Sequence, residues 1–569
     1  MTRQIPDVLI VHPGRLEPDL ARGLRSLEKT DVVRRIWGRD WTVWKPLDQE
    51  ISNRLGWLSA PAAADDDIPG FEAFAASVRG LGLTRAVVLG MGGSSLAPEV
   101  YARLFEGRPD SLDLEILDTT APETVAAAAG RFPVGETLFI VSSKSGTTAE
   151  MLALFSFFYD RARMALGTSH AGGRFVAITD PGTPLEALAG ERRFRRVFSA
   201  APDIGGRFSA LSAFGLLPAA LHGVDLRRLL APARAMSDAC RIERVEENPG
   251  ALLGAVLGTA AGKGMDKLTL LLPQRLRPLA GWLEQLIAES TGKEGRGIVP
   301  VVEDRPGPSG SYGTDRLFVK IGPEEAAALK PRAGGPEGPG SPLVSLALKD
   351  PYDLAGHFFL WEFATAVAAH VMTINAFDQP DVESAKKRTR EVLASALGAR
   401  GAAPEENERP PFAGGLRISP PDASESPRAV LTRFLSGRRE GDYIALLAFL
   451  PRSGAVEEML SGLAAGLRIQ TGLPVTVGFG PRYLHSTGQL HKGDGNKGLF
   501  LMLVAADLPD LAIPAVPGAA LTAPDFGSLF RAQAQGDALA LAEKGRRVLT
   551  LELSHPIQTG LASLSSFLE

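Results

Sequence analysis

Two segments combine glycines with hydroxyl side chains where an apolar run gives way to a helical pattern. The first runs from Val87 through Gly-Met-Gly-Gly-Ser-Ser to Leu96, and the second from Phe139 through Ser-Ser-Lys-Ser-Gly-Thr-Thr to Glu150. Free backbone amides at the start of a helix bind anions, and nearby hydroxyls add hydrogen-bond donors. The second segment lacks the Gly-Lys-Ser/Thr ending of a nucleotide P-loop and the magnesium-binding carboxylate that goes with it. The two loops therefore favour a phosphomonoester over a nucleotide.

Both segments also have simpler structural explanations. A tight strand-to-helix turn gives the same glycine pattern as residues 87–96. Ser or Thr capping of a helix, with Glu150 reaching back in a capping box, accounts for part of the second segment. Capping uses only one hydroxyl, however, and residues 142–148 carry five together with the ammonium of Lys144. This density of donors favours an anion site.

The rest of the chain has the pattern of a mainly parallel α/β fold, in which short apolar runs alternate with helical stretches. In a first lobe the pattern predicts strands at 84–89, 113–117, 137–141, 175–178 and 196–198. In a second lobe it predicts strands at 268–272, 299–302 and 317–321, a helix at 279–293, and two helices ending near Ala399. A third segment has strand-like runs at 443–450, 475–479 and 499–504, a helix through 460–469 and a last helix ending near Arg547. The predicted fold class is α/β, with two doubly wound parallel-sheet lobes plus a C-terminal α/β segment.

The predicted domains follow from this pattern and from the Gly and Pro content. A helical opening and the first lobe take residues 1–245, the second lobe 246–400, a Pro-rich linker 401–427, and the C-terminal α/β segment 428–569. Within the second lobe, the Gly- and Pro-rich stretches 303–313 and 322–342 are expected to be exposed loops. The apolar helix expected from His357 to Met372 carries Glu362 and His370, which favours a buried core helix over a membrane span.

Composition limits the kinds of partner that the chain can have. The 569 residues include 61 Lys and Arg against 65 Asp and Glu, and the formal net charge of -4 provides no global field for nucleic acid or an anionic membrane. The single Cys240 excludes an intramolecular disulfide and a cysteine zinc cluster. The opening residues do not form a convincing signal peptide. We therefore expect a cytoplasmic protein that needs no metal and binds neither nucleic acid nor a membrane.

Five separated motifs make the resemblance to a known family specific. They are, in chain order, Gly-Met-Gly-Gly-Ser (90–94), Ser-Lys-Ser-Gly-Thr-Thr (143–148), Gly-Gly-Arg-Phe-Ser (205–209), Glu-Ser-Thr-Gly-Lys (289–293) and Phe-Asp-Gln-Pro-Asp-Val-Glu-Ser-Ala-Lys (377–386). With these motifs, residues 80–400 resemble the sugar isomerase (SIS) superfamily and, within it, the phosphoglucose isomerase family. The resemblance implies SIS-type lobes and a reversible aldose–ketose isomerisation of glucose 6-phosphate and fructose 6-phosphate in glycolysis and gluconeogenesis. It also implies carbohydrate binding without a cofactor and a homodimeric state.

The resemblance also implies roles for individual residues. Those expected to hold the sugar phosphate are Gly92, Gly93, Ser94, Ser143, Lys144, Ser145, Thr147 and Thr148. Glu289 matches the general base of the family, and Arg207 matches the arginine beside the reacting carbons. Gln379 matches a substrate contact, and Lys386 matches a residue that assists ring opening. Without the motifs, Arg207 could cap a helix C-terminus, Glu289 could face solvent and Lys386 could belong to a solvated charged run.

The chemistry explains why these residue types are needed. Moving a carbonyl between C1 and C2 requires that a carbon-bound proton leave one carbon and return to the next, and one carboxylate such as Glu289 can carry out both transfers. The cis-enediolate intermediate carries negative charge on oxygen, which a fixed guanidinium such as Arg207 stabilises more than it stabilises the neutral ground state. Neither transfer needs a redox cofactor or a metal, and the sequence has no His-Glu-x-x-His pattern.

One part of the family pattern is displaced in the sequence. The His-bearing Thr-Asn-Gly-Gln-His block expected between the glutamate and lysine motifs is absent, and Ser311 to Arg316 stands in its place. Beyond the linker, Leu484 to Gly493 resembles the missing block, and Phe530 to Gln535 resembles the segment that comes after this block in the family. This order resembles the isomerase half of transaldolase/phosphoglucose isomerase fusions. We therefore expect His485 to open the sugar ring, with His491 as the alternative.

Two other functions fit the same motifs. A broader phosphosugar isomerase would also accept mannose 6-phosphate, and details of the pocket decide between the two. A non-catalytic sugar-phosphate sensor would need the loop at 143–148 but neither Glu289 nor Arg207. Both residues are present and no DNA-binding motif accompanies them, which favours the enzyme. The sequence leaves open whether the C-terminal segment completes the site of its own chain or that of a neighbour.

Overall fold

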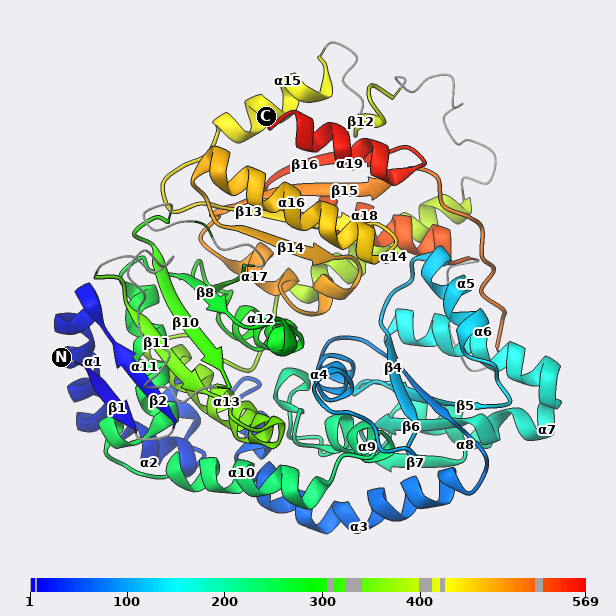
Figure 1. The fold of residues 1–569 in the computed structure, drawn as a ribbon, viewed down its shortest axis with the longest axis horizontal. Coiled ribbons are helices and arrows are strands. Elements are labelled where there is room, and N and C mark those ends of the chain that lie inside the picture. Colours follow the sequence, from blue (N-terminus) through cyan, green and yellow to red (C-terminus); the bar gives the residue numbers. More distant parts are fainter. Residues whose placement is uncertain are drawn as a thin grey trace.

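Three β-sheets with helices packed on their faces make up the structure, and they surround its centre (Figure 1). The structure is a computed structural model that describes residues 2–5, 8–303, 307, 312–323, 340–398, 412–419, 425–516 and 525–568. Parallel pairing dominates each sheet. The predicted α/β class, with two parallel-sheet lobes and a C-terminal α/β segment, is confirmed.

The first sheet is entirely parallel and has the strand order β4-β3-β5-β6-β7. Its strands are β3 (Arg85–Gly90), β4 (Asp113–Leu117), β5 (Thr137–Ser142), β6 (Phe175–Thr179) and β7 (Arg196–Ser199), which confirms the strands predicted for this lobe. Because β3 and β5 are neighbours and Gly90 pairs with Ser142 at their ends, the two hydroxyl-rich loops leave the sheet side by side. The helices of this part are α3 (Ala60–Arg79), α4 (Leu96–Leu104), α5 (Pro122–Arg131), α6 (Ala149–Leu166), α7 (Thr168–Ala171), α8 (Pro184–Glu191) and α9 (Ala213–Leu221).

The second sheet is mixed and has the strand order β1-β2-β11-β10-β8-β9. Its strands are β1 (Arg3–Ile5), β2 (Leu9–His12), β8 (Lys267–Leu271), β9 (Val299–Val302), β10 (Arg316–Gly322) and β11 (Leu343–Ala347). The predicted strands β8, β9 and β10 are confirmed, whereas the sequence pattern does not predict β11. The helices of this part are α1 (Glu17–Lys29), α2 (Val32–Trp37), α10 (Leu226–Ala239), α11 (Pro249–Gly262), α12 (Arg277–Thr291), α13 (Leu354–Val371) and α14 (Val382–Gly398).

Two strands precede the helices of the expected helical opening. The segment from residue 3 to residue 12 forms the antiparallel pair β1 and β2, and β2 pairs antiparallel with β11. The opening therefore extends the second sheet, although the sequence pattern groups it with the first lobe. A strand pair of this kind covers an edge that would otherwise expose unpaired backbone groups, and its partner β11 lies more than three hundred positions away in the chain.

The third sheet has the strand order β12-β16-β15-β13-β14. Its strands are β12 (Leu416–Ser419), β13 (Tyr443–Phe449), β14 (Val475–Phe479), β15 (Gly498–Ala505) and β16 (Arg547–Leu553). The three strands predicted for the C-terminal segment are confirmed as β13, β14 and β15. The helices of this part are α15 (Pro427–Ser436), α16 (Gly454–Thr471), α17 (Gly488–Gly493), α18 (Phe526–Glu543) and α19 (Ile557–Ser566).

Strand β12 is a correction to the predicted linker 401–427, where the Pro content argues against both helix and strand. It pairs antiparallel with β16, which the sequence pattern also does not predict. The pairing supplies hydrogen bonds from a distant part of the chain, so local composition does not reveal it. Most of the linker, and most of the loops expected at 303–313 and 322–342, lie outside the described residues.

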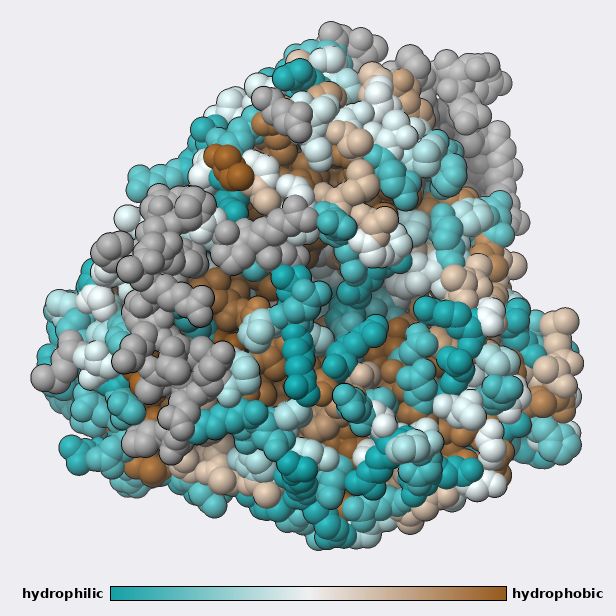
Figure 2. All heavy atoms as spheres, in the orientation of Figure 1, coloured by the Kyte–Doolittle hydropathy of each residue, from teal (hydrophilic) through white to brown (hydrophobic). Residues whose placement is uncertain are grey.

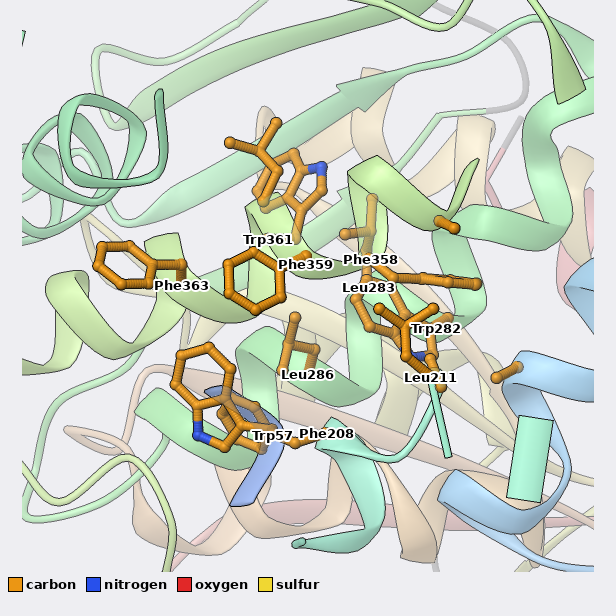
Figure 3. Packing of buried hydrophobic residues seen from close by; sticks show 14 of the residues in the cluster. Trp57, Phe208, Leu211, Trp282, Leu283, Leu286, Phe358, Phe359, Trp361 and Phe363 are labelled. Carbon is orange, nitrogen blue, oxygen red and sulfur yellow. The ribbon is translucent and has the colours of Figure 1, made fainter. Parts of the chain in front are cut away.

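A core of aromatic side chains packs around α12, α13 and the 3-10 turn η7 (Gly206–Phe208) (Figure 3). The ring centroids of Trp282 and Phe358 lie 4.6 Å apart, and those of Trp57 and Phe208 lie 5.3 Å apart. Leu286 of α12 belongs to the same buried cluster. Close packing of this kind resists displacement, so the core fixes both α12 and η7.

Helix α13 is buried along most of its length, as the sequence predicts for residues 357–372. Glu362 is fully buried there, and neither of its carboxylate oxygens has a hydrogen-bond partner among the described residues. Burial raises the pKa of Glu362 well above its usual range, so we expect a protonated carboxyl group. In the part of the chain that the structure describes, no helix has the length and apolar character needed to span a membrane.

Candidate active site

The glycine turn after β3 brings three parts of the chain together. Gly92 has a φ of +56°, and a Cβ there would lie 2.8 Å from Nε2 of Gln285 and 2.9 Å from the backbone oxygen of His485. A Cβ on Gly93 would lie 2.0 Å from the backbone oxygen of Gly206. Glycine is needed at both positions because any side chain would force the backbones apart. The turn therefore lies directly against α12, η7 and the 3-10 turn that contains His485.

The loop between β5 and α6 links its hydroxyl groups to one another. The Oγ of Ser143 lies 2.9 Å from Oγ1 of Thr148 and accepts a hydrogen bond from the backbone N–H of Gly146 at 3.1 Å. The Oγ of Ser145 lies 3.0 Å from Oγ1 of Thr147. A hydroxyl can rotate to donate elsewhere, so these groups are held in place and can turn toward an anion.

Two other predicted phosphate ligands have different surroundings. Ser94 is buried at the end of the glycine turn. Lys144 stands on the second loop, but its Nζ donates to Oδ2 of Asp180 at 2.5 Å and to the backbone oxygen of Pro202 at 3.0 Å. The structure thus pairs the ammonium with residues that follow the neighbouring strands β6 and β7, so Lys144 has to share its charge between Asp180 and any bound phosphate.

The capping box expected at the start of α6 is not formed. The helix begins at Ala149, and the preceding Thr148 makes no side-chain cap hydrogen bond. Glu150 is therefore at the second helical position, and its buried carboxylate contacts His485 of the C-terminal segment. Glu150 therefore contacts His485, whereas the local sequence suggests that it caps its own helix.

Arg207 and Glu289 form a buried ion pair between η7 and the last turn of α12. The NH1 of Arg207 lies 3.1 Å from Oε1 of Glu289, and their side chains are only 3% and 9% exposed. The other carboxylate oxygen, Oε2, accepts from Nε2 of Gln285 at 3.1 Å. Glu289 therefore does not face solvent, and both of its oxygens are oriented by donors.

The remaining donors of Arg207 hold the segment that carries Gln379. Its Nε donates to Oγ of Ser290 at 2.8 Å, and its NH1 donates to Oε1 of Gln379 at 3.1 Å. Its NH2 donates to the backbone oxygens of Ala376 at 2.6 Å and Asp378 at 3.1 Å. Arg207 thus caps no helix, and it brings the third, fourth and fifth motifs into one cluster.

Lys293, the last residue of the fourth motif, supports the same segment. Its Nζ donates to the backbone oxygen of Asp378 at 2.6 Å and to the carboxylate of Asp378 at 2.7 Å. Burial, together with the nearby charge of Arg207, lowers the pKa of Lys293 to about 8. The loop before α14 is consequently anchored from two sides.

His485 lies at the end of the turn η13 (Arg482–His485) and contacts the first lobe through Glu150. Its Nε2 is 2.9 Å from Oε1 of Glu150, which also accepts from Nε2 of Gln533 at 2.6 Å. Thr120 donates to the amide oxygen of Gln533 at 2.6 Å and so fixes the orientation of that amide. Burial opposes ionisation of Glu150, but the neighbouring His485 holds the pKa of this carboxyl below its usual range. We therefore expect a carboxylate beside the imidazole.

His491, the alternative, has a different environment on α17. It is buried among the rings of Tyr443, Tyr483 and Phe500. Burial, followed by the charges of nearby cations, holds the pKa of His491 well below its usual range. A histidine that resists protonation is poorly suited to protonate a ring oxygen.

The displaced His-bearing block docks directly on two of the other motifs. Nε2 of Gln489 donates to the backbone oxygen of Gly292 and to the carboxylate of Asp381, both at 2.9 Å. The backbone N–H of Asp381 donates in return to Gln489 at 2.9 Å. The His-bearing block is therefore adjacent to the fourth and fifth motifs in space, although it is distant from them in the sequence.

Lys386 lies on the exposed side of α14, which packs against the helix α18 that carries Gln533. Its positive charge contributes to the lowered pKa of Glu150, which indicates that the ammonium is near the His485 pair. Among the described residues, there is no group of three or more His, Cys, Asp and Glu side chains arranged to hold a metal ion.

The site combines three chemical capabilities. The Arg207–Glu289 pair can exchange a carbon-bound proton beside a fixed positive charge, and the Glu150–His485 pair can move protons on oxygen. The hydroxyl-rich loop offers donors to a phosphate. Two residues that sequence reasoning does not assign are Glu150, which resembles a helix cap, and Gln533, whose only signal is its place in the block at 530–535.

Comparison with known proteins identifies the family. A model of the family "Phosphoglucose isomerase" matches residues 76–304. The glucose-6-phosphate isomerase of Synechococcus sp. (strain JA-3-3Ab) is 30% identical over 459 residues, and the match covers 68% of this chain and 85% of that protein. The chain belongs to the phosphoglucose isomerase family. A second relative, the glucose-6-phosphate isomerase of Geobacter sp. (strain M21), is 31% identical over 404 residues, with 59% of this chain and 74% of that protein covered.

Solved structures share the fold of this phosphoglucose isomerase family member. The glucose-6-phosphate isomerase of Chlamydia trachomatis D/UW-3/Cx aligns with a TM-score of 0.56 at 20% identity, covering 68% of this chain and 87% of that one. A hypothetical protein of Thermus thermophilus aligns with a TM-score of 0.54 at 25% identity, covering 69% of this chain and all of that one.

Proposed function

We propose that the chain catalyses the reversible isomerisation of glucose 6-phosphate and fructose 6-phosphate. The observation that carries the proposal is the buried pair of Arg207 and Glu289, 3.1 Å apart, in a chain that belongs to the phosphoglucose isomerase family. Glu289 removes the proton from one carbon and returns it to the neighbouring carbon. Arg207 stabilises the negative oxygen of the cis-enediolate that forms between the two transfers.

A coupled assay tests this function. The purified chain is given fructose 6-phosphate, and glucose 6-phosphate and mannose 6-phosphate are measured separately. We expect glucose 6-phosphate to form, and mannose 6-phosphate would indicate the broader isomerase. Binding of the sugar phosphate without either product would instead indicate a sensor.

We expect the double replacement Lys144→Ala and Thr148→Ala to raise the KM for fructose 6-phosphate about 10- to 100-fold, because a dianionic phosphate loses a charged and a neutral donor. Inhibition by inorganic phosphate is expected to weaken in parallel. Lys263→Ala, which removes an exposed lysine on α11's C-terminal side that pairs with Asp19, is the control. Unchanged KM and unchanged phosphate inhibition would move the anion site elsewhere.

His485 is proposed to open the sugar ring, with Glu150 as its carboxylate partner and Lys386 assisting. Opening a cyclic hemiacetal requires a proton on the ring oxygen and removal of the proton from the anomeric hydroxyl. The 2.9 Å contact between His485 and Glu150 supports this role, since a carboxylate partner holds the imidazole in one orientation.

We expect His485→Ala to lower turnover of cyclic glucose 6-phosphate about 100-fold while hardly changing proton exchange in a substrate that has no ring to open. A tetrose 4-phosphate is such a substrate, because its phosphate blocks the oxygen that would close the ring. Its C2 proton exchange in D2O is followed by NMR, with His491→Ala in parallel. Equal losses on both substrates, or a defect confined to the His491 variant, would contradict the assignment.

The proposal also covers the domain organisation, the oligomeric state and the cellular location of the chain. Its motif order supports a likeness to the isomerase half of transaldolase/phosphoglucose isomerase fusions. We also propose the domain division 1–245, 246–400, 401–427 and 428–569, apart from the strand contributions described above. A homodimer, a cytoplasmic location and the absence of nucleic-acid binding remain predictions of the sequence.

A further inference from the structure

Arg482 begins the same turn that ends with His485, and it reaches into the first lobe. Its NH2 donates to Oε2 of Glu99, and its NH1 lies 3.0 Å from Oδ2 of Asp118. The side chains of all three residues are 10–17% exposed. One guanidinium therefore joins the C-terminal segment to two carboxylates of the first lobe.

Both carboxylates are tied to the glycine turn after β3. Oδ2 of Asp118, the oxygen that faces Arg482, also accepts from the Oγ of Ser95 at 3.0 Å. Glu99 lies on the first turn of α4, and its backbone N–H donates to the backbone oxygen of Ser95 at 2.9 Å. The ion pairs of Arg482 consequently fix η13 relative to the turn that precedes α4.

The other end of η13 is fixed by the helix that carries the proposed base. The backbone oxygen of His485 accepts from Nε2 of Gln285 at 2.9 Å, and the same amide group donates to Glu289 at 3.1 Å. The turn is four residues long, so a shift of Arg482 has to move His485 as well. Both ends of the turn that carries the imidazole are therefore anchored.

Arg482 also lies at the wall of a large cavity beside the turn. It lines a cavity of about 1340 Å³ between β4, β14 and α12, which opens near the middle of the face in Figure 2. Tyr483 and Ser486 line this cavity too, whereas His485, Glu289 and Arg207 do not. The contacts of Arg482 with Glu99 and Asp118 therefore place it to orient η13.

We propose that Arg482 is a positioning residue for ring opening, and that it holds His485 against Glu150 by pairing with Glu99 and Asp118. The proposal rests on the proposed role of His485. Deleting one partner of a buried ion pair also destabilises a fold, because the other charge is left without compensation. The test must therefore separate a shift of the turn from a general loss of structure.

The decisive variants are Arg482→Lys, which keeps the charge but loses the planar fork, and Glu99→Gln, which leaves the arginine in place. A displacement of about 1 Å in a catalytic group can cost on the order of 100-fold in rate. We expect both variants to lower turnover of cyclic glucose 6-phosphate about 10- to 100-fold, with less than about threefold change in C2 proton exchange of a tetrose 4-phosphate. Arg452→Lys is the matched control, because Arg452 also approaches Glu99, at 3.9 Å, but lies outside η13.

His485→Ala is measured beside these variants, and thermal unfolding is recorded for each. If His485→Ala separates the two substrates and neither Arg482→Lys nor Glu99→Gln does, the role of Arg482 is overturned while the role of His485 stands. If His485→Ala itself fails to separate them, both assignments are overturned. Arg482→Lys and Glu99→Gln could instead lose activity equally on the two substrates and unfold at a lower temperature. In that case the ion pairs of Arg482 only stabilise the fold, and the proposal is also overturned.

Discussion

Replacing Glu289 by Gln is expected to lower kcat about 100- to 10,000-fold, because the variant keeps the size of the side chain but removes the base. The KM for the sugar phosphate should change little, since the phosphate loop is on the other lobe. Deuterium incorporation at C2 in D2O should be lost together with turnover. The amide oxygen of Gln can still accept from Arg207, so the fold around the pair is expected to survive.

The control for this experiment is Glu294→Gln, an exposed glutamate a few positions further along that pairs with Lys45. It should behave like the unmodified protein. If Glu289→Gln exchanges the C2 proton at the normal rate, another residue is the base and the role of Glu289 is wrong.

Arg207→Lys is expected to lower kcat/KM about 100- to 1,000-fold, because a lysine retains the charge but cannot reproduce five donor contacts in one plane. It also releases the backbone oxygens of Ala376 and Asp378, so the segment with Gln379 loses one of its two anchors. A planar hydroxamate of a phosphorylated sugar acid, which mimics the enediolate, should lose affinity in proportion to kcat/KM.

Arg234→Lys serves as the control for Arg207→Lys, since Arg234 is a surface residue paired with Asp65. The outcome that counts against the role of Arg207 is unchanged affinity for the hydroxamate despite lower turnover. In that case the arginine would organise the loop without stabilising the charge on the intermediate.

Some strands could be predicted closely from the sequence, although they lie at sheet edges and are only partly buried. The strands β4, β9 and β14 have the predicted bounds, since apolar runs between turn signals mark them. The strands β2, β11, β12 and β16 could not be predicted, because each depends on pairing with a distant segment. The run at β16 also comes directly after the helical pattern of α18, so the expected helix extends too far.

Some contacts of the candidate site could likewise be predicted from the sequence, and others could not. The resemblance to the phosphoglucose isomerase family implies that Arg207, Glu289 and Gln379 belong to one site, and the structure brings these three together. The sequence does not predict the contact of Glu150 with His485, because Glu150 two residues after Thr148 looks like a local helix cap. Nor does it predict that Lys144 pairs with Asp180, a residue 36 positions away on the next loop.

The hydrogen bond between Glu150 and Gln533 joins residues 383 positions apart in the chain. Ribosomes add roughly 5–20 residues per second, so about 20–80 s pass between the synthesis of these two residues. All strands of the first two sheets have been synthesised once Ala347 is added, before either His485 or Gln533 exists. A nascent chain therefore acquires the group proposed for ring opening late, and a prematurely terminated chain never acquires it.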